Sequence, residues 1–198
     1  MLRNNKDQAF FGAPLVAFPS LGRDYVEWFC RHTGLPAPLD PAQVSELFAR
    51  AAYRPEILGA AADVVRFDFA LRAEDVPMRF ARAVEEQITA SNDETLRVLH
   101  SLTPLQSAVL RVMALAGASY APFEAQTLRR CQAVIDTLAP GTSVRADVPN
   151  VQQALAALQD KALVWRAERG IYALEDAAVG QILAAAGMLE AVPTARPD

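Results

Sequence analysis

The segment from Thr103 to Asp176 constrains the fold most, because its pattern predicts three helices followed by a two-stranded ribbon. The first helix should begin at Thr103-Pro104-Leu105-Gln106, where Thr103 can cap, Pro104 suits the first helical position and Gln106 can complete a capping box. Gly117 is suited to end this helix. Apolar residues recur between these ends at helical spacing and predict one buried face, formed by Leu105, Ala108, Val109, Val112, Met113 and Ala116.

Two further helices are predicted after Gly117. The second should follow Ala121-Pro122 and end at Pro140-Gly141, and the third should run from Pro149 to Lys161. The second helix is expected to bury Leu128, Cys131, Ile135 and Leu138, and the third Val151, Ala154, Leu155, Leu158 and Ala162.

Residues 163–166 and 171–174 have the apolar or alternating pattern of strands, and Glu168-Arg169-Gly170 supplies turn residues between them. Three helices followed by a hairpin is the order of a winged helix, in which the hairpin is the wing. A last helix from Ala177 to Leu189 should pack on this module through Val179, Ile182, Leu183 and Ala186.

Composition restricts the class of protein. A chain of 198 residues with 52% hydrophobic residues can fill a core, and its length predicts one domain with a smaller packed partner. The polar ends, 1–6 and 192–198, are expected to be loosely ordered. No apolar run approaches the roughly 20 residues that span a bilayer, and no signal peptide precedes Phe10-Phe11, so we expect a soluble, cytoplasmic protein without a membrane partner.

Residues 1–72 predict a small helical bundle. A short strand over 15–18 should be followed by helices beginning at Ser20 or Leu21, at Asp40-Pro41 and at Pro55, joined by short proline-containing loops. The inner faces of the three helices are expected to carry Leu21, Tyr25, Trp28, Phe29 and His32, then Val44, Leu47, Phe48 and Ala51, then Leu58, Ala61, Ala62 and Val65.

Residues 73–102 predict a connecting helix with a break or a new cap at Thr89-Ala90-Ser91-Asn92-Asp93. Its apolar stripe consists of Val76, Phe80, Ala83, Val84 and Ile88. The predicted fold class is therefore mainly α, with a small helical bundle over 1–72, a connecting helix over 73–102 and a winged-helix domain with a β-hairpin wing over 103–190.

Three stretches together resemble one family. They are Phe10-Phe11-Gly12 with 18–25, Tyr53-Arg54-Pro55-Glu56-Ile57-Leu58, and Leu102 through Asp176. In this order they are similar to the last sheet strand and first lid helix, the Arg-Pro lid segment, and the winged helix of P-loop ATPases of the AAA+/STAND kind, of the archaeal-ATPase-like type. The resemblance covers nearly the whole chain and implies the C-terminal region of such an ATPase.

The resemblance implies that Arg54 is a nucleotide-binding lid arginine that contacts the terminal phosphate. Alternatively, Arg54 pairs with Glu56 or Asp63, or is solvated. The chain has no glycine-rich loop ending in Gly-Lys-Ser or Gly-Lys-Thr and no apolar strand ending in an acid that could hold magnesium, so by itself it cannot be an ATPase of this type. We therefore expect no cofactor in this chain, and ATP with Mg²⁺ only if a P-loop domain lies upstream in a longer protein. The chain is otherwise a free-standing remnant of such an ATPase.

No group of residues predicts an enzyme or a metal site. Cys30 and His32 are two positions apart on a helix and so point about 200° apart. Cys30 and Cys131 lack the spacing of metal or redox motifs and are expected to be buried, reduced thiols. His100 and Glu85-Glu86 fit a solvated helix surface.

If the module reads DNA, its third helix would lie in the groove, where Asn150, Gln152 and Gln153 can pair with adenine. Phosphate contacts would then come from Arg129, Arg130, Arg145, Arg166 and Arg169. The cations between Thr103 and Asp176 are these five with Arg111 and Lys161, and they are matched one for one by Glu124, Asp136, Asp147, Asp160, Glu168, Glu175 and Asp176. This balance, in a chain of net charge −4, gives no net attraction for duplex unless the five arginines cluster on one face.

Two functions are consistent with this pattern. The first is a non-catalytic C-terminal region of an ATP-binding protein, whose winged helix contacts an ATPase domain or a second copy, or binds DNA weakly. The second is a stand-alone winged-helix transcriptional regulator, whose N-terminal bundle dimerises or senses a ligand. A winged helix can serve either purpose, so the fold does not decide between them.

Overall fold

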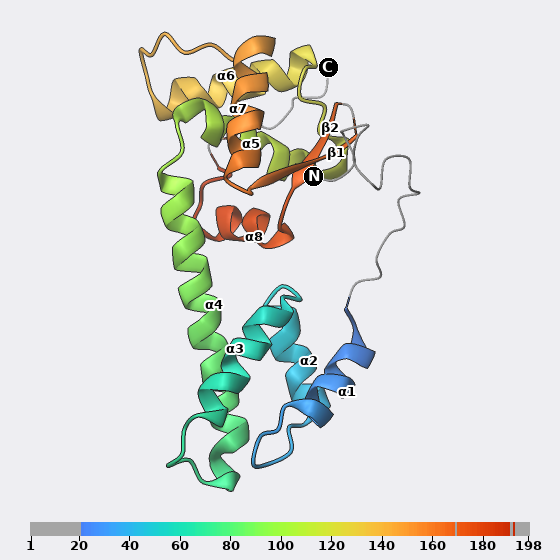
Figure 1. The fold of residues 1–198 in the computed structure, drawn as a ribbon. Helices are drawn as coiled ribbons and strands as arrows, with labels where there is room; N and C mark the ends of the chain where they lie inside the picture. Colours follow the sequence, from blue (N-terminus) through green and yellow to red (C-terminus); the bar gives the residue numbers. More distant parts are fainter. Residues whose placement is uncertain (1–20, 169, 191, 193–198) are drawn as a thin grey trace. The chain divides into compact units, whose positions relative to one another are not determined.

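The computed structural model describes residues 21–168, 170–190 and 192. The described residues are mainly helical, with eight α-helices and one antiparallel sheet of two strands, so the predicted class is confirmed at this level (Figure 1). The elements are α1 (Arg23–His32), α2 (Pro41–Arg50), α3 (Pro55–Arg66), η1 (Ala73–Asp75), α4 (Val76–His100), α5 (Pro104–Ala116), η2 (Gly117–Ser119), α6 (Ala125–Leu138), α7 (Val148–Asp160), β1 (Val164–Glu168), β2 (Ile171–Leu174) and α8 (Ala177–Ala185).

The described residues divide into two compact units between Glu94 and Thr95. We call residues 21–94 the bundle unit and the described residues from Thr95 onward the hairpin unit. The division falls inside α4, within the segment predicted as a connecting helix. The strand predicted over 15–18 lies outside the described residues, as does Arg169.

The bundle unit is held together by one apolar core. Asp40 caps α2 by accepting from the Ala42 amide at 3.0 Å, and Pro41 and Pro55 occupy the first helical positions, as the sequence predicts. The expected inner faces of α2 and α3 are buried, and aromatic rings join the helices across the core. Their centroid separations are 5.1 Å for Tyr25 and Phe48 and 6.0 Å for Phe29 and Phe80.

The first helix of the bundle buries a different stripe from the expected one. Val26 and Phe29 are buried, whereas Trp28 and His32, predicted on the inner face, are exposed. The His32 ring stacks on the Trp28 ring instead, with centroids 5.0 Å apart. Aromatic residues at i and i+4 can therefore satisfy each other on the surface of a helix without entering the core.

The predicted break at Thr89-Ala90-Ser91-Asn92-Asp93 is wrong, because α4 is a continuous helix through this segment. Serine and asparagine favour caps and turns when their side chains bond to the nearby backbone. Here the Ser91 hydroxyl and the Asn92 side-chain oxygen accept from Arg54. Serine and asparagine thus contact a tertiary partner from inside a continuous helix.

The central helix of the hairpin unit is α5. Its capping box is present as predicted: the Gln106 amide donates to Thr103 Oγ1 at 3.3 Å, and the Thr103 amide donates to Gln106 Oε1 at 3.2 Å. The prediction of one buried face is wrong, because all residues from Ser107 to Met113 are buried. This helix contacts α6, α7, α8 and β2, so it is covered on several sides, as expected of a helix that is apolar all round.

The buried residues of α6, α7 and α8 match those predicted from the sequence, except near the helix ends. In α6, Val134 is fully buried and Leu138, predicted inside, is exposed. In α7 the four predicted helical positions are buried, but Ala162 lies beyond the helix, at φ 53°, and is exposed. Ala186 is likewise exposed, because α8 ends at Ala185 rather than at Leu189.

The hairpin forms as predicted. Strands β1 and β2 pair antiparallel, with Val164 opposite Leu174 and Trp165 opposite Ala173, and the register shifts between Arg166 and Glu168. Gly170 adopts φ 85° in the turn, a conformation that favours glycine. Three helices followed by a hairpin therefore occur in the predicted order.

Candidate functional site

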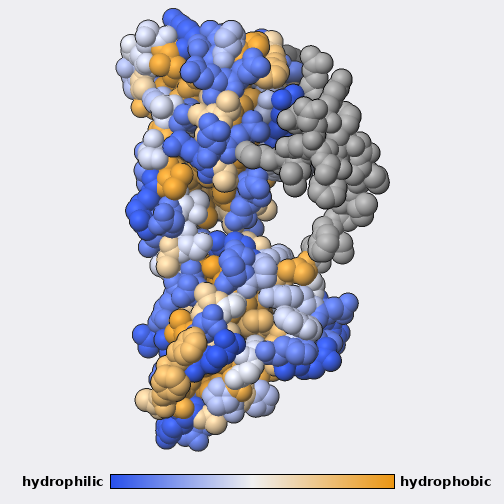
Figure 2. Space-filling view, viewed as in Figure 1, coloured by the Kyte–Doolittle hydropathy of each residue, from blue (hydrophilic) through white to orange (hydrophobic). Residues whose placement is uncertain are grey.

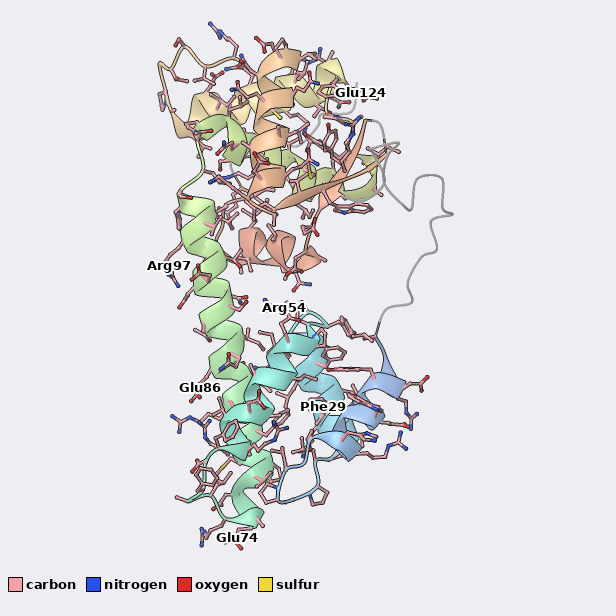
Figure 3. The ribbon with its side chains drawn as sticks, in the orientation of Figure 1. Phe29, Arg54, Glu74, Glu86, Arg97 and Glu124 are labelled. Atoms are coloured by element: carbon pink, nitrogen blue, oxygen red, sulfur yellow. The ribbon has the colours of Figure 1, made fainter. Side chains whose placement is uncertain are left out.

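Arg54, the predicted nucleotide-binding residue, lies directly before α3 and is only 9% exposed (Figure 3). Its guanidinium donates three hydrogen bonds within the bundle unit: Nε to the Ala51 carbonyl at 2.9 Å, Nη1 to Ser91 Oγ at 2.8 Å, and Nη2 to Asn92 Oδ1 at 3.3 Å. All three acceptors are neutral. Arg54 therefore ties the α2–α3 turn to α4 and keeps its positive charge without an ion pair among the described residues.

Neither of the two acids considered as alternative partners, Glu56 and Asp63, forms an ion pair with Arg54. Asp63 forms an ion pair with Arg66, and Glu56 is exposed in the first turn of α3. Arg54 is thus neither solvated nor paired with either acid. A phosphate that reached Arg54 would have to replace the bonds to Ser91 or Asn92.

The turn that carries Arg54 has an uncommon backbone. Ala52 and Tyr53 both adopt positive φ, 54° and 58°, which is rare for residues other than glycine. Tyr53 packs edge-on against Phe48, with ring centroids 5.4 Å apart. The two left-handed residues place Arg54 at the start of α3 with its side chain inside the unit, and no sequence signal indicates this conformation.

The predicted DNA-reading amides lie on α7 and differ in their availability. Gln152 and Gln153 are exposed. Asn150 is half-buried, and its side-chain nitrogen donates to the Arg145 carbonyl at 3.1 Å. Two of the three amides therefore point away from the core.

The predicted phosphate-binding arginines come from separate elements. Arg129 and Arg130 lie on α6, Arg145 lies in the loop before α7, and Arg166 lies on β1. Arg129 and Arg145 are exposed, but Arg130 is half-buried and its Nε has no hydrogen-bond partner among the described residues. Arg166 stacks over the Tyr172 ring, 5.8 Å from its centroid.

Helix α7 itself contains no cation. Asp147 caps it by accepting from the Asn150 amide at 2.9 Å, and Asp160 is its last residue. The carboxylate at Asp147 uses the end of the helix where a phosphate would otherwise be favoured. This helix therefore presents amides and acids, not the charge that attracts a duplex.

The outer face of the hairpin is apolar, a feature not singled out in the sequence. Trp165 is 40% exposed and Ile171 is 51% exposed. Trp165 pairs with Ala173, two residues from Ile171, so the three side chains share one face of the ribbon. Figure 2 shows hydrophobic surface on both units. The alternating pattern of each strand could have predicted this face. Trp165 directly follows the buried Val164 and Ile171 directly precedes the buried Tyr172, so Trp165 and Ile171 lie on the other face of the ribbon.

Arg111 is a second buried arginine, 7% exposed, at a position on α5 where the sequence gives no sign of burial. Its Nε donates to Ser107 Oγ at 3.0 Å and its Nη1 to the Met188 carbonyl at 2.8 Å. Burial lowers the pKa of the Arg111 guanidinium. Arg111 fixes the segment that follows α8.

Both cysteine thiols have a raised pKa. Burial raises the pKa of Cys131 to about 12, so this thiol is protonated at neutral pH. Cys30 is half-buried. Its pKa is raised mainly by burial and to a lesser extent by the negative charge of Asp40. The predicted burial of Cys131 is confirmed, and that of Cys30 holds only in part.

Among the residues that the structure describes, no group of three or more His, Cys, Asp or Glu side chains could hold a metal ion. Within the same part of the chain, no helix combines the length and the apolar character needed to cross a bilayer. No protein-family model, no curated protein and no solved structure matches this chain.

Proposed function

We propose that this chain is a non-catalytic recognition segment of an ATP-binding protein, and that its hairpin unit is a winged helix that binds protein rather than duplex DNA. The observation that carries this proposal is the charge of α7, which has no cation and an acid at each end. Affinity for duplex comes mainly from neutralised phosphates, so a helix of this kind contributes little to it.

Two further observations support protein contact over DNA contact. With Arg111 buried, the seven acids between Thr103 and Asp176 outnumber the six remaining cations. The outer hairpin face exposes Trp165 and Ile171, and exposed aromatic and aliphatic side chains on a rigid element are typical anchors in protein interfaces.

The ATP-binding partner follows from the sequence resemblance and from Arg54. The Arg54 guanidinium donates only to neutral acceptors, so an anion that replaced Ser91 or Asn92 would not compete with a carboxylate of the bundle unit. We propose that a P-loop domain supplies that anion as the terminal phosphate of ATP with Mg²⁺, and that Arg54 exchanges Ser91 or Asn92 for it.

Site-specific photocrosslinking in cells that make the protein tests the choice between protein and DNA. A photoreactive phenylalanine at Ile171 should form protein adducts, whereas the same group at exposed Arg23 on α1 should not, since Arg23 belongs neither to the hairpin face nor to the turn that carries Arg54. An adduct at position 171 that nuclease digestion removes would overturn the proposal, as would equal protein labelling at both positions.

A further inference from the structure

The bundle unit contains a groove of about 550 Å³ that the proposed function does not use. One wall is α2 and the other is the beginning of α4 together with η1. The lining residues are Leu39, Asp40, Gln43, Val44, Glu46, Leu47, Arg50, Glu74, Pro77, Met78, Phe80 and Ala81. All of them belong to the bundle unit, so the groove is complete within one compact part of the chain.

The groove is elongated. Its α2 wall extends from Asp40 to Arg50, eleven residues whose ends lie about 15 Å apart along the helix axis. Asp40, Gln43, Val44 and Leu47 are spaced at i, i+3, i+4 and i+7, so they form one continuous row along α2. Pro77, Met78 and Ala81 form a shorter row on α4. A trough of this length between two helices matches about three turns of a third helix.

The floor of the groove is apolar and its edge carries an unusually exposed side chain. Four of its lining residues, Leu39, Val44, Leu47 and Phe80, are buried side chains of the core. Met78 is 71% exposed on the α4 side. Methionine adapts its shape to different partners and is common on surfaces that bind amphipathic helices.

The rim of the groove is acidic. Asp40, Glu46 and Glu74 line it, whereas Arg50 is its single lining cation and forms an ion pair with Glu85 at 2.9 Å. Arg72 pairs with Glu74 at 3.0 Å, but both side chains are largely exposed, so this pair is weak and exchangeable. The lining therefore attracts a cationic ligand.

We propose that this groove binds a basic amphipathic helix of a partner protein. Apolar residues of that helix, spaced at i, i+3 or i+4, and i+7, lie on Leu47, Pro77 and Met78, and its flanking Lys or Arg residues contact Glu46 and Glu74. This contact lies on the bundle unit and is independent of the proposed contact through the hairpin.

A synthetic helix of leucine and lysine, with leucine at every third and fourth position, is a suitable probe. Titration of the full chain should shift the methyl resonances of Leu39, Leu47 and Met78. A matched peptide in which glutamate replaces lysine should leave them unchanged. Met78→Ser, at an exposed position that does not endanger folding, should weaken binding by about tenfold through lost apolar contact.

Charge variants separate this site from general attraction to an acidic protein. Glu46→Lys and Glu74→Lys, made separately, should each weaken binding of the lysine peptide by about threefold or more, whereas Glu56→Lys, the same charge change on α3 outside the groove, should not. Equal affinities for all variants, methyl shifts in the hairpin unit instead, or saturable binding of spermidine without binding of the peptide would each overturn the proposal.

Discussion

Two arginines are buried in the part of the chain that the structure describes, and neither has a carboxylate partner there. Arg54 donates to Ala51, Ser91 and Asn92, and Arg111 donates to Ser107 and Met188. An unpaired charge inside a protein is costly unless hydrogen bonds satisfy it. Each arginine therefore connects segments that are far apart in the sequence, and its removal leaves buried acceptors without donors.

Arg54→Ala should lower the free energy of unfolding by about 1–3 kcal/mol, because it removes three hydrogen bonds from a charged donor in the core of the bundle unit. Urea denaturation measures the change. Arg50→Ala is the matched control on the preceding helix, where an exposed ion pair with Glu85 contributes at most about 1 kcal/mol. Equal losses in the two variants would contradict the structural role of Arg54.

Arg111 allows a sharper comparison, because a long apolar side chain can replace it. Arg111→Ala should destabilise by about 2–4 kcal/mol through lost packing and unsatisfied acceptors. Arg111→Met should cost less, since replacing a buried charge by an apolar group of similar length avoids its desolvation. Thermal and urea unfolding of both variants decide this, and a methionine variant as unstable as the alanine variant would contradict it.

The buried thiol of Cys131 makes a pH prediction. Its pKa is raised from 9.0 to about 12 by burial, so the folded state holds a proton that the unfolded state releases. This contribution to stability is complete below about pH 9 and is lost as pH rises from there toward 12. The unfolding free energy should therefore fall over that range, less steeply in Cys131→Ala.

Thiol labelling at pH 8 gives an independent reading of the same group. Cys30, half-buried, should react before Cys131, which should react only at the rate of unfolding. Mass spectrometry of labelled peptides distinguishes the two. Rapid labelling of Cys131 in the native protein would show that the thiol is not enclosed.

At the scale of elements, local signals predicted the helix starts well. Asp40-Pro41, Pro55 and the capping box of α5 all appear where the sequence places them. These signals depend on neighbouring residues only. Tertiary packing explains the errors: Arg54 removes the break in α4, and the helices around α5 bury both of its faces.

The capping box offers a direct measurement of one local signal. Thr103→Ala should destabilise the hairpin unit by about 1 kcal/mol, because the Gln106 amide loses its acceptor. Ser101→Ala is a matched control two residues earlier, where an exposed hydroxyl bonds to the Val98 carbonyl within α4. Equal effects in chemical denaturation would mean that the cap has no special role.

For the candidate sites, the sequence predicted the exposure of two amides but not the contacts of Arg54. It placed the amides Gln152 and Gln153 on an exposed helix face and identified Arg54 as a notable residue. It did not predict that Arg54 is held by Ser91 and Asn92, because residues 37 and 38 positions apart meet only in the folded unit. The groove was missed for the same reason.

At the scale of the whole molecule, two compact units carry separate surfaces. The core of the bundle unit consists of residues between Val26 and Val84, and α5 centres the hairpin unit. The bundle unit has an acidic groove, and the hairpin unit has an apolar outer face with a helix that lacks cations. These features are the basis of our proposal that both surfaces contact protein rather than a nucleic-acid backbone.

Duplex binding measured by fluorescence anisotropy at about 50 and about 200 mM salt tests the central claim most directly. A Gln152→Lys/Gln153→Lys variant, which adds two cations to the exposed face of α7, serves as the reference for detectable binding. We predict no saturable binding of the unmodified chain at either salt concentration. Tight binding of the unmodified chain at low salt that falls steeply at high salt would contradict the claim.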